Sequence, residues 1–516
     1  MTEALVLLGR LVTFDPARPE VEDGALYIGA DERVAAVQLR TDPSPGGFES
    51  ARRVRTGGAI YPGLIDPHSH VVYNILPLWS PPGTTKPFVN RKDWPKHGDY
   101  EGTVSDPANA LGALAGKAHL KYCEVKAVVG GTTAIQGSAK MAYPYEGWLV
   151  RNVEYETFKT GEKTVYQSAL PLKNAEEYRL NRERMKDRNA FIYHLSEGTD
   201  PVLIDEYELA RTRKILRPRF CGIHCTALGE PQFEEWEQIA EDIDAAEDVE
   251  GEENGTIVWS PFSNLWLYRD TTAVVAARDK GMRVCLGSDW SPSGSKNLLG
   301  ELKVADMWNR THLNREFSAE ELCAMATRNP ADALGWSARL GRLKEGLHGD
   351  VLVTTDRGGE PYRNLIESVE RDVQLVAING QPFYGTARPM KAAGATLDEP
   401  IRLGRLRRRV RLIYPGIKDA DMGWAAALAD MEEAKRDPVA RYLEIEQLHE
   451  VGDPPPWLRT DKPWDDPAVT GKPVPVTVRI PPLDSLVHDA AYFRAVERAP
   501  LHGGLLDALR SYYLPA

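Results

Sequence analysis

The feature that most constrains the fold of this chain is a repeated alternation between residues 62 and 338. Short apolar, β-branched runs of about four to eight residues alternate there with longer segments compatible with helices. This alternation is typical of βα units, in which helices cover a parallel sheet. Eight runs are predicted to be strands, and they begin near Leu64, Thr132, Leu149, Thr164, Phe191, Phe220, Thr256 and Arg283. Eight such units predict an α/β fold with a closed (β/α)8 barrel of the TIM type.

The segments on either side of the barrel predict a second, smaller unit. Short β-like runs separated by Pro, Gly and Asp fill the first 60 residues, and similar runs return at 341–354 and 373–381. We therefore predict a small β-sandwich built from residues 1–61 and 339–390, flanking a catalytic barrel at 62–338.

Residues 391–516 form a different kind of segment. Helical patterns near 422–448 and 483–498 enclose a proline-rich passage, and no recognisable site is assembled there. We predict a mainly helical C-terminal extension that serves as a lid, a wrap around the barrel or a dimer contact.

Length and charge exclude several classes of protein. The chain has 516 residues, too many for one hydrophobic core, and 42% apolar with 27% charged residues is ordinary for a soluble protein. A formal net charge of −12 argues against nucleic-acid binding, which needs a clustered basic face. Two charge runs, 241–253 and 402–411, are predicted to be solvated faces or ion-pair networks. A small-molecule substrate is therefore the expected partner.

Cysteine usage and the apolar runs indicate the compartment. Five scattered cysteines do not form a disulfide framework, and no apolar stretch reaches the roughly 20 residues of a membrane helix. The first residues lack the basic opening and cleavage site of a signal peptide. We predict a cytoplasmic protein with no membrane partner, and we expect a homodimer or higher homo-oligomer.

The sharpest chemical motif is Pro-Gly-Leu-Ile-Asp-Pro-His-Ser-His at residues 62–70. Side chains alternate along a strand, so His68 and His70 point to the same side and converge on one point. Asp66 has the same parity and is expected one layer deeper, where a bracing role and a plain structural role stay open. The apolar run and the Pro-Gly entry favour a metal site over a pair of hydrogen-bonded histidines.

Three further strand ends carry polar groups that fit the same site. The apolar run that begins at Phe191 ends in His194 and Glu197, His224 ends the next run, and Asp289 ends the last one. The carboxyl ends of barrel strands lie at one face, where such folds keep their active sites. Three imidazoles and a carboxylate around an open position are typical of a catalytic metal centre.

These motifs resemble those of the amidohydrolase superfamily, in its cytosine deaminase-like branch with the triazine hydrolases. The resemblance runs from about residue 4 to 386 and includes 194–197 as the His-x-x-Glu element, 260–264 on the seventh strand and 287–289 on the eighth. It implies one divalent metal ion, held by a set of four ligands: His68, His70, His194 and Asp289. Zn²⁺ is favoured, and Fe²⁺ or Mn²⁺ suits the same donors.

The resemblance also implies the roles of the catalytic groups. Metal-bound hydroxide would attack the substrate, Asp289 would accept its proton, and Glu197 would carry protons to a ring nitrogen or leaving group. His224 would polarise the electrophilic carbon or orient the hydroxide. A tetrahedral intermediate would then expel ammonia, an amine or a ring nitrogen.

Substrate contacts are expected from aromatic residues near this site. The long loop after the first barrel strand carries Trp79 and Trp94, which either form a wall over a flat substrate or pack the loop down. Asn264 and Trp290 complete the predicted substrate-binding set. Ala227 stands where a second histidine is common in the family, and 290–295 replaces a run of small residues.

Three hypotheses about function follow. The first is a metal-dependent hydrolase of a C–N bond in a cyclic or heteroaromatic small molecule, similar to the deaminases. The second is an amidase or cyclic-amide hydrolase that uses the same metal. The third is a non-catalytic binding protein on a decayed barrel. We predict an enzyme, because every ligand and both auxiliary groups are present.

Overall fold

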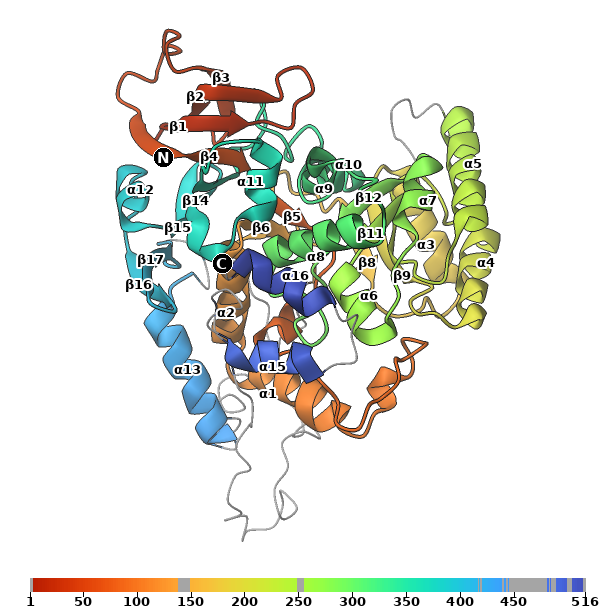
Figure 1. Cartoon of the computed structure of the whole chain (residues 1–516). Helices are drawn as coiled ribbons and strands as arrows, with labels where there is room; N and C mark the ends of the chain where they lie inside the picture. The colour runs from red at the N-terminus through yellow and green to blue at the C-terminus, as the bar shows by residue number, and fades with distance from the viewer. Residues whose placement is uncertain are drawn as a thin grey trace.

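The computed structural model describes residues 3–137, 149–247, 255–415, 417, 420–438, 440–441, 444, 480–481, 483, 489–498 and 504–513. The strands lie in three sheets, and helices surround them (Figure 1). The proline-rich passage after 444 and half of the acidic run at 241–253 lie outside the described residues.

Two parallel sheets contain the eight strands predicted for the barrel. Their orders are β5-β6-β7 and β12-β11-β10-β9-β8, so neighbours in space are neighbours in the chain. Each strand begins within two residues of its predicted start. The bounds are β5 (Leu64–Asp66), β6 (Thr132–Ile135), β7 (Arg151–Asn152), β8 (Val165–Ser168), β9 (Ala190–Leu195), β10 (Phe220–His224), β11 (Thr256–Trp259) and β12 (Arg283–Leu286).

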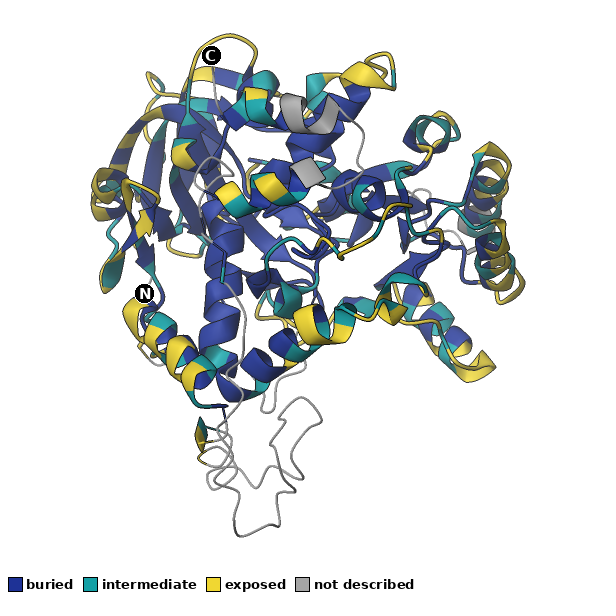
Figure 2. Ribbon diagram, turned by 60° about the horizontal axis from the view of Figure 1, so that its bottom comes forward, coloured by how far each residue is buried: buried dark blue, intermediate teal, exposed yellow. Residues whose placement is uncertain are grey.

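The first and last of these strands come together at their carboxyl ends. A parallel bridge joins Ser69, after β5, to Asp289, after β12. Every residue of β9, β10 and β11 is buried, as expected for parallel strands covered on both faces (Figure 2). The predicted metal ligands therefore extend from rigid, buried elements.

The two segments that flank the βα region combine in one sheet of nine strands, in the order β16-β17-β15-β14-β13-β4-β1-β2-β3. β1 and β4 pair in parallel, and the other pairs are antiparallel. The bounds are β1 (Leu5–Val12), β2 (Glu20–Ile28), β3 (Val34–Leu39), β4 (Arg52–Pro62), β13 (Val351–Thr355), β14 (Val373–Ile378), β15 (Gln381–Gly385), β16 (Asp398–Leu403) and β17 (Leu406–Arg411).

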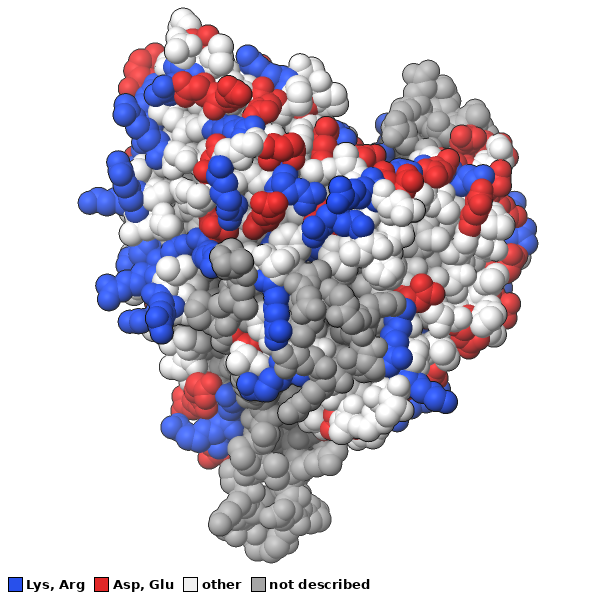
Figure 3. Space-filling view, in the orientation of Figure 1, with Lys and Arg blue, Asp and Glu red and all other residues white. Residues whose placement is uncertain are grey.

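The last two strands of this sheet, β16 and β17, come from the segment after 390, for which we predict a mainly helical extension. They carry the arginine run at 402–411, and basic side chains gather at that edge of the molecule (Figure 3). Arg409 Nε lies 2.6 Å from an oxygen of Asp398, and Arg402 is exposed. The run therefore combines an ion pair with solvated positions.

Helices cover the parallel sheets, and parts of the C-terminal segment pack on them. α13 contacts α2, and α16 contacts α8. None of the described helices is long and apolar enough to cross a membrane. The α-helices are α1 (Asp106–Leu114), α2 (Gly116–Val129), α3 (Ala175–Lys186), α4 (Ile204–Thr212), α5 (Glu230–Glu247), α6 (Pro261–Tyr268), α7 (Val274–Asp279), α8 (Leu298–Thr311), α9 (Ala319–Ala324), α10 (Arg328–Ala333), α11 (Pro361–Glu367), α12 (Ala387–Ala392), α13 (Trp424–Arg436), α15 (Ala490–Arg498) and α16 (Gly504–Tyr513).

Short helical turns complete the described structure. Two of them, η1 and η2, lie in the long segment between β5 and α1, and the others are brief turns at the ends of longer elements. Their bounds are η1 (Val71–Ile75), η2 (Trp94–Lys96), η3 (Glu101–Ser105), η4 (Pro201–Leu203) and η5 (Glu370–Asp372).

Candidate metal centre

His68 and His70 follow β5 directly, as the His-x-His pattern predicts. His68 is fully buried, and its Nδ1 lies 2.8 Å from the hydroxyl oxygen of Ser260, at the end of β11. Asp66 lies one layer deeper and accepts hydrogen bonds from the main-chain amides of His68 (3.3 Å) and Ser288 (3.1 Å). This carboxylate ties the segment after β5 to the segment after β12.

His194 comes from β9 and faces His68. Their Nε2 atoms are 3.2 Å apart. The main chain at this point is fixed from the side, because Nη1 of the buried Arg91 donates to the carbonyl oxygen of His194 at 3.0 Å. The other end of the guanidinium pairs with Glu206 at 3.0 Å. The ring of His194 is therefore presented by a strand whose backbone is held on both sides.

Asp289 follows β12 and approaches both histidines of the first motif. Its Oδ1 lies 3.3 Å from Nε2 of His68 and 3.6 Å from Nε2 of His70. The main-chain amide of Asp289 donates to the carbonyl oxygen of His68 at 2.9 Å. Gly287 permits this approach, because a Cβ there would lie 2.5 Å from the Cβ of His68. Close packing of the segment after β12 against His68 therefore requires a glycine at position 287.

His224 ends β10, and its ring is oriented by a chain of hydrogen bonds. Trp259 Nε1, which can only donate, donates to Thr271 Oγ1 at 2.6 Å. Thr271 then donates to Asn264 Oδ1 at 3.3 Å, so the amide nitrogen of Asn264 faces Nδ1 of His224 at 2.9 Å. Because Nδ1 accepts, the neutral ring carries its proton on Nε2.

The Nε2 proton of His224 points at the centre of the cluster. Nε2 lies 3.7 Å from Oε1 of Glu197 and 4.0 Å from Oδ2 of Asp289. A hydrogen-bond donor is therefore aimed at the space between the two predicted proton-transfer carboxylates.

Glu197 is held by a second chain of donors. Trp94 Nε1 donates to the hydroxyl oxygen of Tyr268 at 3.1 Å, and Tyr268 donates its own proton to Oε1 of Glu197 at 2.7 Å. Burial, together with the charge of Glu197, raises the pKa of Tyr268 well above its usual value. The phenol consequently stays protonated and remains a donor to the carboxylate.

The backbone is strained where these side chains emerge. Ser196, His224, Cys225 and Asp289 have φ values of 50°, 64°, 52° and 56°, in the left-handed region that non-glycine residues rarely adopt. Such conformations cost free energy and persist where the surroundings over-determine them, commonly at functional sites. Three of the strand ends at the cluster therefore use strained backbone to aim their side chains.

Burial keeps the imidazoles neutral. It lowers the pKa of His70 to about 4 and the pKa values of His68 and His194 well below their usual range, with mutual repulsion as a further cause. Burial also raises the pKa of Asp289 well above its usual value. A bound cation reverses this effect on the carboxylate, because it supplies a positive charge in direct contact.

The four predicted ligands fit a divalent cation. A tetrahedral zinc ion with bonds of about 2.1 Å requires neighbouring donor atoms about 3.4 Å apart. The three pairwise distances given above, 3.2 Å, 3.3 Å and 3.6 Å, agree with that separation. The donor atoms of His68, His70 and His194 all lie within 4.8 Å of one another. Neutral imidazoles plus a carboxylate are also the donor types that zinc prefers.

An aromatic cluster lies beside the histidines. The centroid of the Trp290 ring is 6.4 Å from that of His70, 5.1 Å from Tyr73 and 5.0 Å from Trp94. Tyr100 joins the same group, 5.4 Å from Trp94. One of the four predicted substrate contacts, Trp290, is therefore adjacent to a predicted metal ligand, and a second, Trp94, packs against Trp290.

The other two predicted substrate contacts have different surroundings. Trp79 is buried; its ring stacks on Phe88 at 6.3 Å, and its Nε1 donates to Asp99 at 3.1 Å. Asn264 is fully buried, with its amide engaged by His224 and Thr271.

Two residues that the motifs do not reveal support the site: Tyr268 and Arg91. Tyr268 has a sequence signal, because it lies four residues after Asn264 on α6 and therefore shares a helix face with it. Arg91 lies in a long loop and has no periodic signal of this kind. Only the fold brings it to the main chain of β9.

Comparison with known proteins shows which proteins this chain resembles. A model of the amidohydrolase family matches residues 172–382. Over 433 residues the chain is 25% identical to a 5-methylthioadenosine/S-adenosylhomocysteine deaminase of Syntrophobacter fumaroxidans, which covers 73% of this chain and 92% of the relative. A deaminase with the same name from Pyrococcus furiosus is 33% identical over 138 residues, covering 25% of this chain and about a third (32%) of that relative.

Solved structures share the fold. An adenosine deaminase from Xanthomonas campestris with bound zinc has a TM-score of 0.55 at 18% identity, covering 87% of this chain and 99% of that one. A triazine hydrolase from Arthrobacter aurescens has a TM-score of 0.54 at 18% identity, with 74% and 94% covered. The predicted resemblance to the amidohydrolase superfamily is confirmed. So is the prediction of an enzyme, a hydrolase of carbon–nitrogen bonds other than peptide bonds.

Proposed function

We propose that this chain is a metal-dependent hydrolase that releases ammonia or an amine from a heteroaromatic small molecule. One observation carries the proposal: three histidines, two of them buried and one half-buried, and a carboxylate converge at the distances a divalent cation requires, with His224 and Glu197 beside them. The deaminases among its relatives support the reaction class. The bridge between Ser69 and Asp289 supports a closed (β/α)8 barrel as the scaffold.

The proposed ligands are His68, His70, His194 and Asp289, and Zn²⁺ is the proposed ion. A cation at this position supplies a water ligand whose pKa is lowered to about 7. The side chain of His70 is 26% exposed, whereas those of His68 and Asp289 are 0% and 5% exposed. Substrate and solvent therefore approach from the side of His70.

Each remaining polar group has a proposed task set by its contacts. Asp289, with one oxygen toward the histidines and the other 4.0 Å from His224, takes up the proton of the attacking water. Glu197, fixed by Tyr268, delivers a proton to the leaving nitrogen or to a ring nitrogen. His224 donates from Nε2 to the charge that develops on the oxygen at the electrophilic carbon.

The aromatic cluster gives the proposed substrate its shape. Trp290 lies beside His70 and Trp94 packs against Trp290, and aromatic rings of this kind pack well against a flat heterocycle. We retain Trp79 and Asn264 as proposed contributors, Trp79 through the wall it builds with Phe88 and Asn264 through the orientation of His224.

We also propose the division into 1–61, 62–338, 339–390 and 391–516 for the two parts of the sheet domain, the barrel and the extension. The sheet that joins β1–β4 to β13–β15 supports the first three of these segments. A homodimer is proposed for the assembly, to be checked by light scattering on the full chain.

A substrate screen tests the function. The enzyme, stripped with a chelator and reloaded with Zn²⁺, is offered aminated purines, pyrimidines and triazines, cyclic amides and acylated amines, while ammonia and new carboxylate are both measured. We expect metal-dependent ammonia release from a ring that stays intact. A product with a new carboxylate would instead identify an amide hydrolase, and activity that is indifferent to the metal would overturn the proposal.

A further inference from the structure

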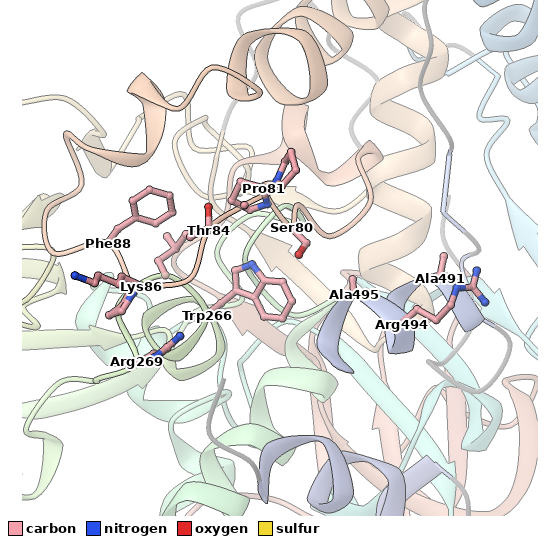
Figure 4. A pocket seen from close by; sticks show the side chains of 14 residues that line it. Ser80, Pro81, Thr84, Lys86, Phe88, Trp266, Arg269, Ala491, Arg494 and Ala495 are labelled. Carbon is pink, nitrogen blue, oxygen red and sulfur yellow. The ribbon is translucent and has the colours of Figure 1, made fainter. Parts of the chain in front are cut away.

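A second cavity lies beside the barrel, between the loop at 80–88, the end of α6 and α15 (Figure 4). Its volume is about 540 Å³, within the range of sites for small organic ligands. We call it the Trp266 cavity, after the indole that lies near its middle. None of the proposed metal ligands and none of the proposed proton-transfer groups lines it.

The charged side chains that line the Trp266 cavity are all cationic: Lys86, Arg269 and Arg494. Arg269 donates to the carbonyl oxygen of Thr85 at 3.3 Å. Lys86 and Arg494 are exposed, and within the described part of the chain neither is within ion-pair or hydrogen-bond distance of a partner. A concave surface with uncompensated positive charge attracts an anion.

The aromatic part of the cavity is held in place. Trp266 Nε1 donates to the main-chain oxygen of Trp79 at 2.9 Å, and its ring stacks on Phe262 at 5.7 Å and 19°. Figure 4 shows the indole between Lys86 and Arg269 on one side and Arg494 on the other. A fixed, half-buried indole offers apolar surface to a flat ring at little cost in side-chain entropy.

The cavity is distinct from the metal centre because of the helix geometry of α6. Asn264 and Tyr268, four residues apart, share the face that contacts His224 and Glu197. Trp266, two residues from each of them, projects from another face of the helix and lines the cavity. None of the described residues that line the cavity carries a carboxylate, imidazole or thiol, so the cavity is suited to binding rather than to chemistry.

We propose that the Trp266 cavity binds an anion that carries a flat aromatic or heteroaromatic ring. The ring lies against Trp266, and the anionic group is held by Arg494 or by Lys86 with Arg269. A carboxylate and a phosphate present the same chemistry to these cations. This inference is independent of the proposed catalytic function, because it concerns binding at residues outside the metal centre.

Calorimetric titration of the full chain tests the proposal with four probes. Indole-3-acetate and adenosine 5′-monophosphate carry both a ring and an anion, indole-3-acetamide carries the ring alone, and inorganic phosphate carries the anion alone. We expect indole-3-acetate to bind at least tenfold more tightly than indole-3-acetamide, or adenosine 5′-monophosphate to bind at least tenfold more tightly than inorganic phosphate. The absence of binding by both at millimolar concentration would overturn the proposal, as would equal affinity of each full probe and its partial probe.

Matched variants locate the site. Lys86→Gln combined with Arg494→Gln is expected to weaken the aromatic anion at least tenfold. Lys391→Gln combined with Arg402→Gln removes the same charge from exposed positions on α12 and β16, outside the cavity, and is expected to change affinity less than twofold. Equal effects of the two double variants would show a general charge effect and would contradict the proposal.

Two further variants separate the cavity from the metal centre. Trp266→Leu is expected to weaken binding, whereas Trp266→Phe, which keeps an aromatic face, should restore most of it. Asp289→Asn is expected to leave the affinity within twofold of the wild type. Loss of binding in Asp289→Asn would place the probe at the metal centre and overturn the assignment, whatever the outcome of the substrate screen.

Discussion

The metal centre and the Trp266 cavity are neighbours that hold their polar groups in opposite ways. At the candidate metal centre, every proposed ligand lies in or shortly after a parallel strand, and hydrogen bonds to Ser260 and Asn264 fix the rings of His68 and His224. In the cavity, Lys86 lies on a loop and Arg494 on a C-terminal helix, both exposed. Side chains that take part in a reaction need a fixed orientation, which hydrogen bonds provide at the metal centre. Side chains that only bind a ligand need no such orientation, and the unneutralised charge in the cavity is sufficient.

The burial of the two regions differs for the same reason. Desolvation in the cluster shifts the pKa values of its histidines and of Asp289, so their protonation states are set by the fold. Mutations at the metal centre should therefore change chemistry by large factors, and mutations at the cavity should change binding alone.

The largest expected effect is that of Asp289→Asn. The variant keeps the shape of the side chain but loses its charge, its value as a ligand and its ability to accept a proton. We expect turnover to fall by about 10³-fold or more, with an unchanged circular dichroism spectrum. Turnover close to that of the wild type, measured on the substrate found in the screen, would remove Asp289 from the mechanism.

Glu197→Gln should have the next largest effect. The amide still accepts a hydrogen bond from Tyr268 but cannot transfer a proton, so we expect a loss of about 10²- to 10³-fold in kcat. Metal content should remain that of the wild type, as measured by elemental analysis. Loss of the metal in this variant would instead make Glu197 a ligand.

His119 is a buried histidine outside the cluster and serves as a comparison for it. Its Nε2 donates to the carbonyl oxygen of Val72 at 2.7 Å, and burial lowers its pKa to about 4. Because the folded state favours the neutral ring, its contribution to stability is complete above pH 6.5 and is lost as the pH falls toward 4. The loss amounts to about 3 kcal/mol.

Denaturant unfolding of His119→Gln and the wild type between pH 4.5 and 7 measures this contribution. The free energy of unfolding of the wild type should fall more steeply with decreasing pH than that of the variant. Parallel curves would mean that His119 titrates alike in the folded and unfolded states.

A smaller effect is expected for Tyr268→Phe, which sharpens the distinction between groups that react and groups that position. The variant removes one hydrogen bond to a charged carboxylate, so kcat should fall by about tenfold with little change in KM. The acid limb of the kcat profile should also shift, because the variant removes a hydrogen-bond donor from the carboxylate that transfers protons. A lower kcat with an unshifted profile would indicate a structural role alone.

The smallest effect is predicted at the cavity. Lys86→Gln with Arg494→Gln should leave kcat on the small heterocyclic substrate within about twofold of the wild type. Salt screens the electrostatic effect of exposed charges on a site farther away than about 10 Å. Steady-state kinetics checks this. A tenfold fall in kcat would mean that the two regions act as one site.

Much of the βα region and of the candidate metal centre can be predicted from the sequence, because both depend on local patterns. Apolar runs place the strands, and polar residues that end such runs meet at one face, as His194, His224 and Asp289 do. Tyr268 needs one further step, the helical spacing from Asn264. Its contact with Trp94 depends on the path of a long loop, which no local pattern specifies.

The Trp266 cavity and the last strands of the nine-stranded sheet could not be predicted in the same way. Arg494 lines the cavity from a helix that lies more than 200 residues after α6 in the chain. The sequence around a single arginine does not indicate which distant residues it will lie near. β16 and β17 carry an arginine run that is more typical of a solvated segment. Tertiary pairing with β15 places them in the sheet.

Anomalous diffraction at the zinc edge from crystals of the zinc-loaded protein tests the central claim most directly. The account predicts one strong peak that lies about 2.1 Å from Nε2 of His68, from a ring nitrogen of His70 and of His194, and from an oxygen of Asp289. A peak elsewhere, or none at this position in crystals shown to contain zinc, would contradict it.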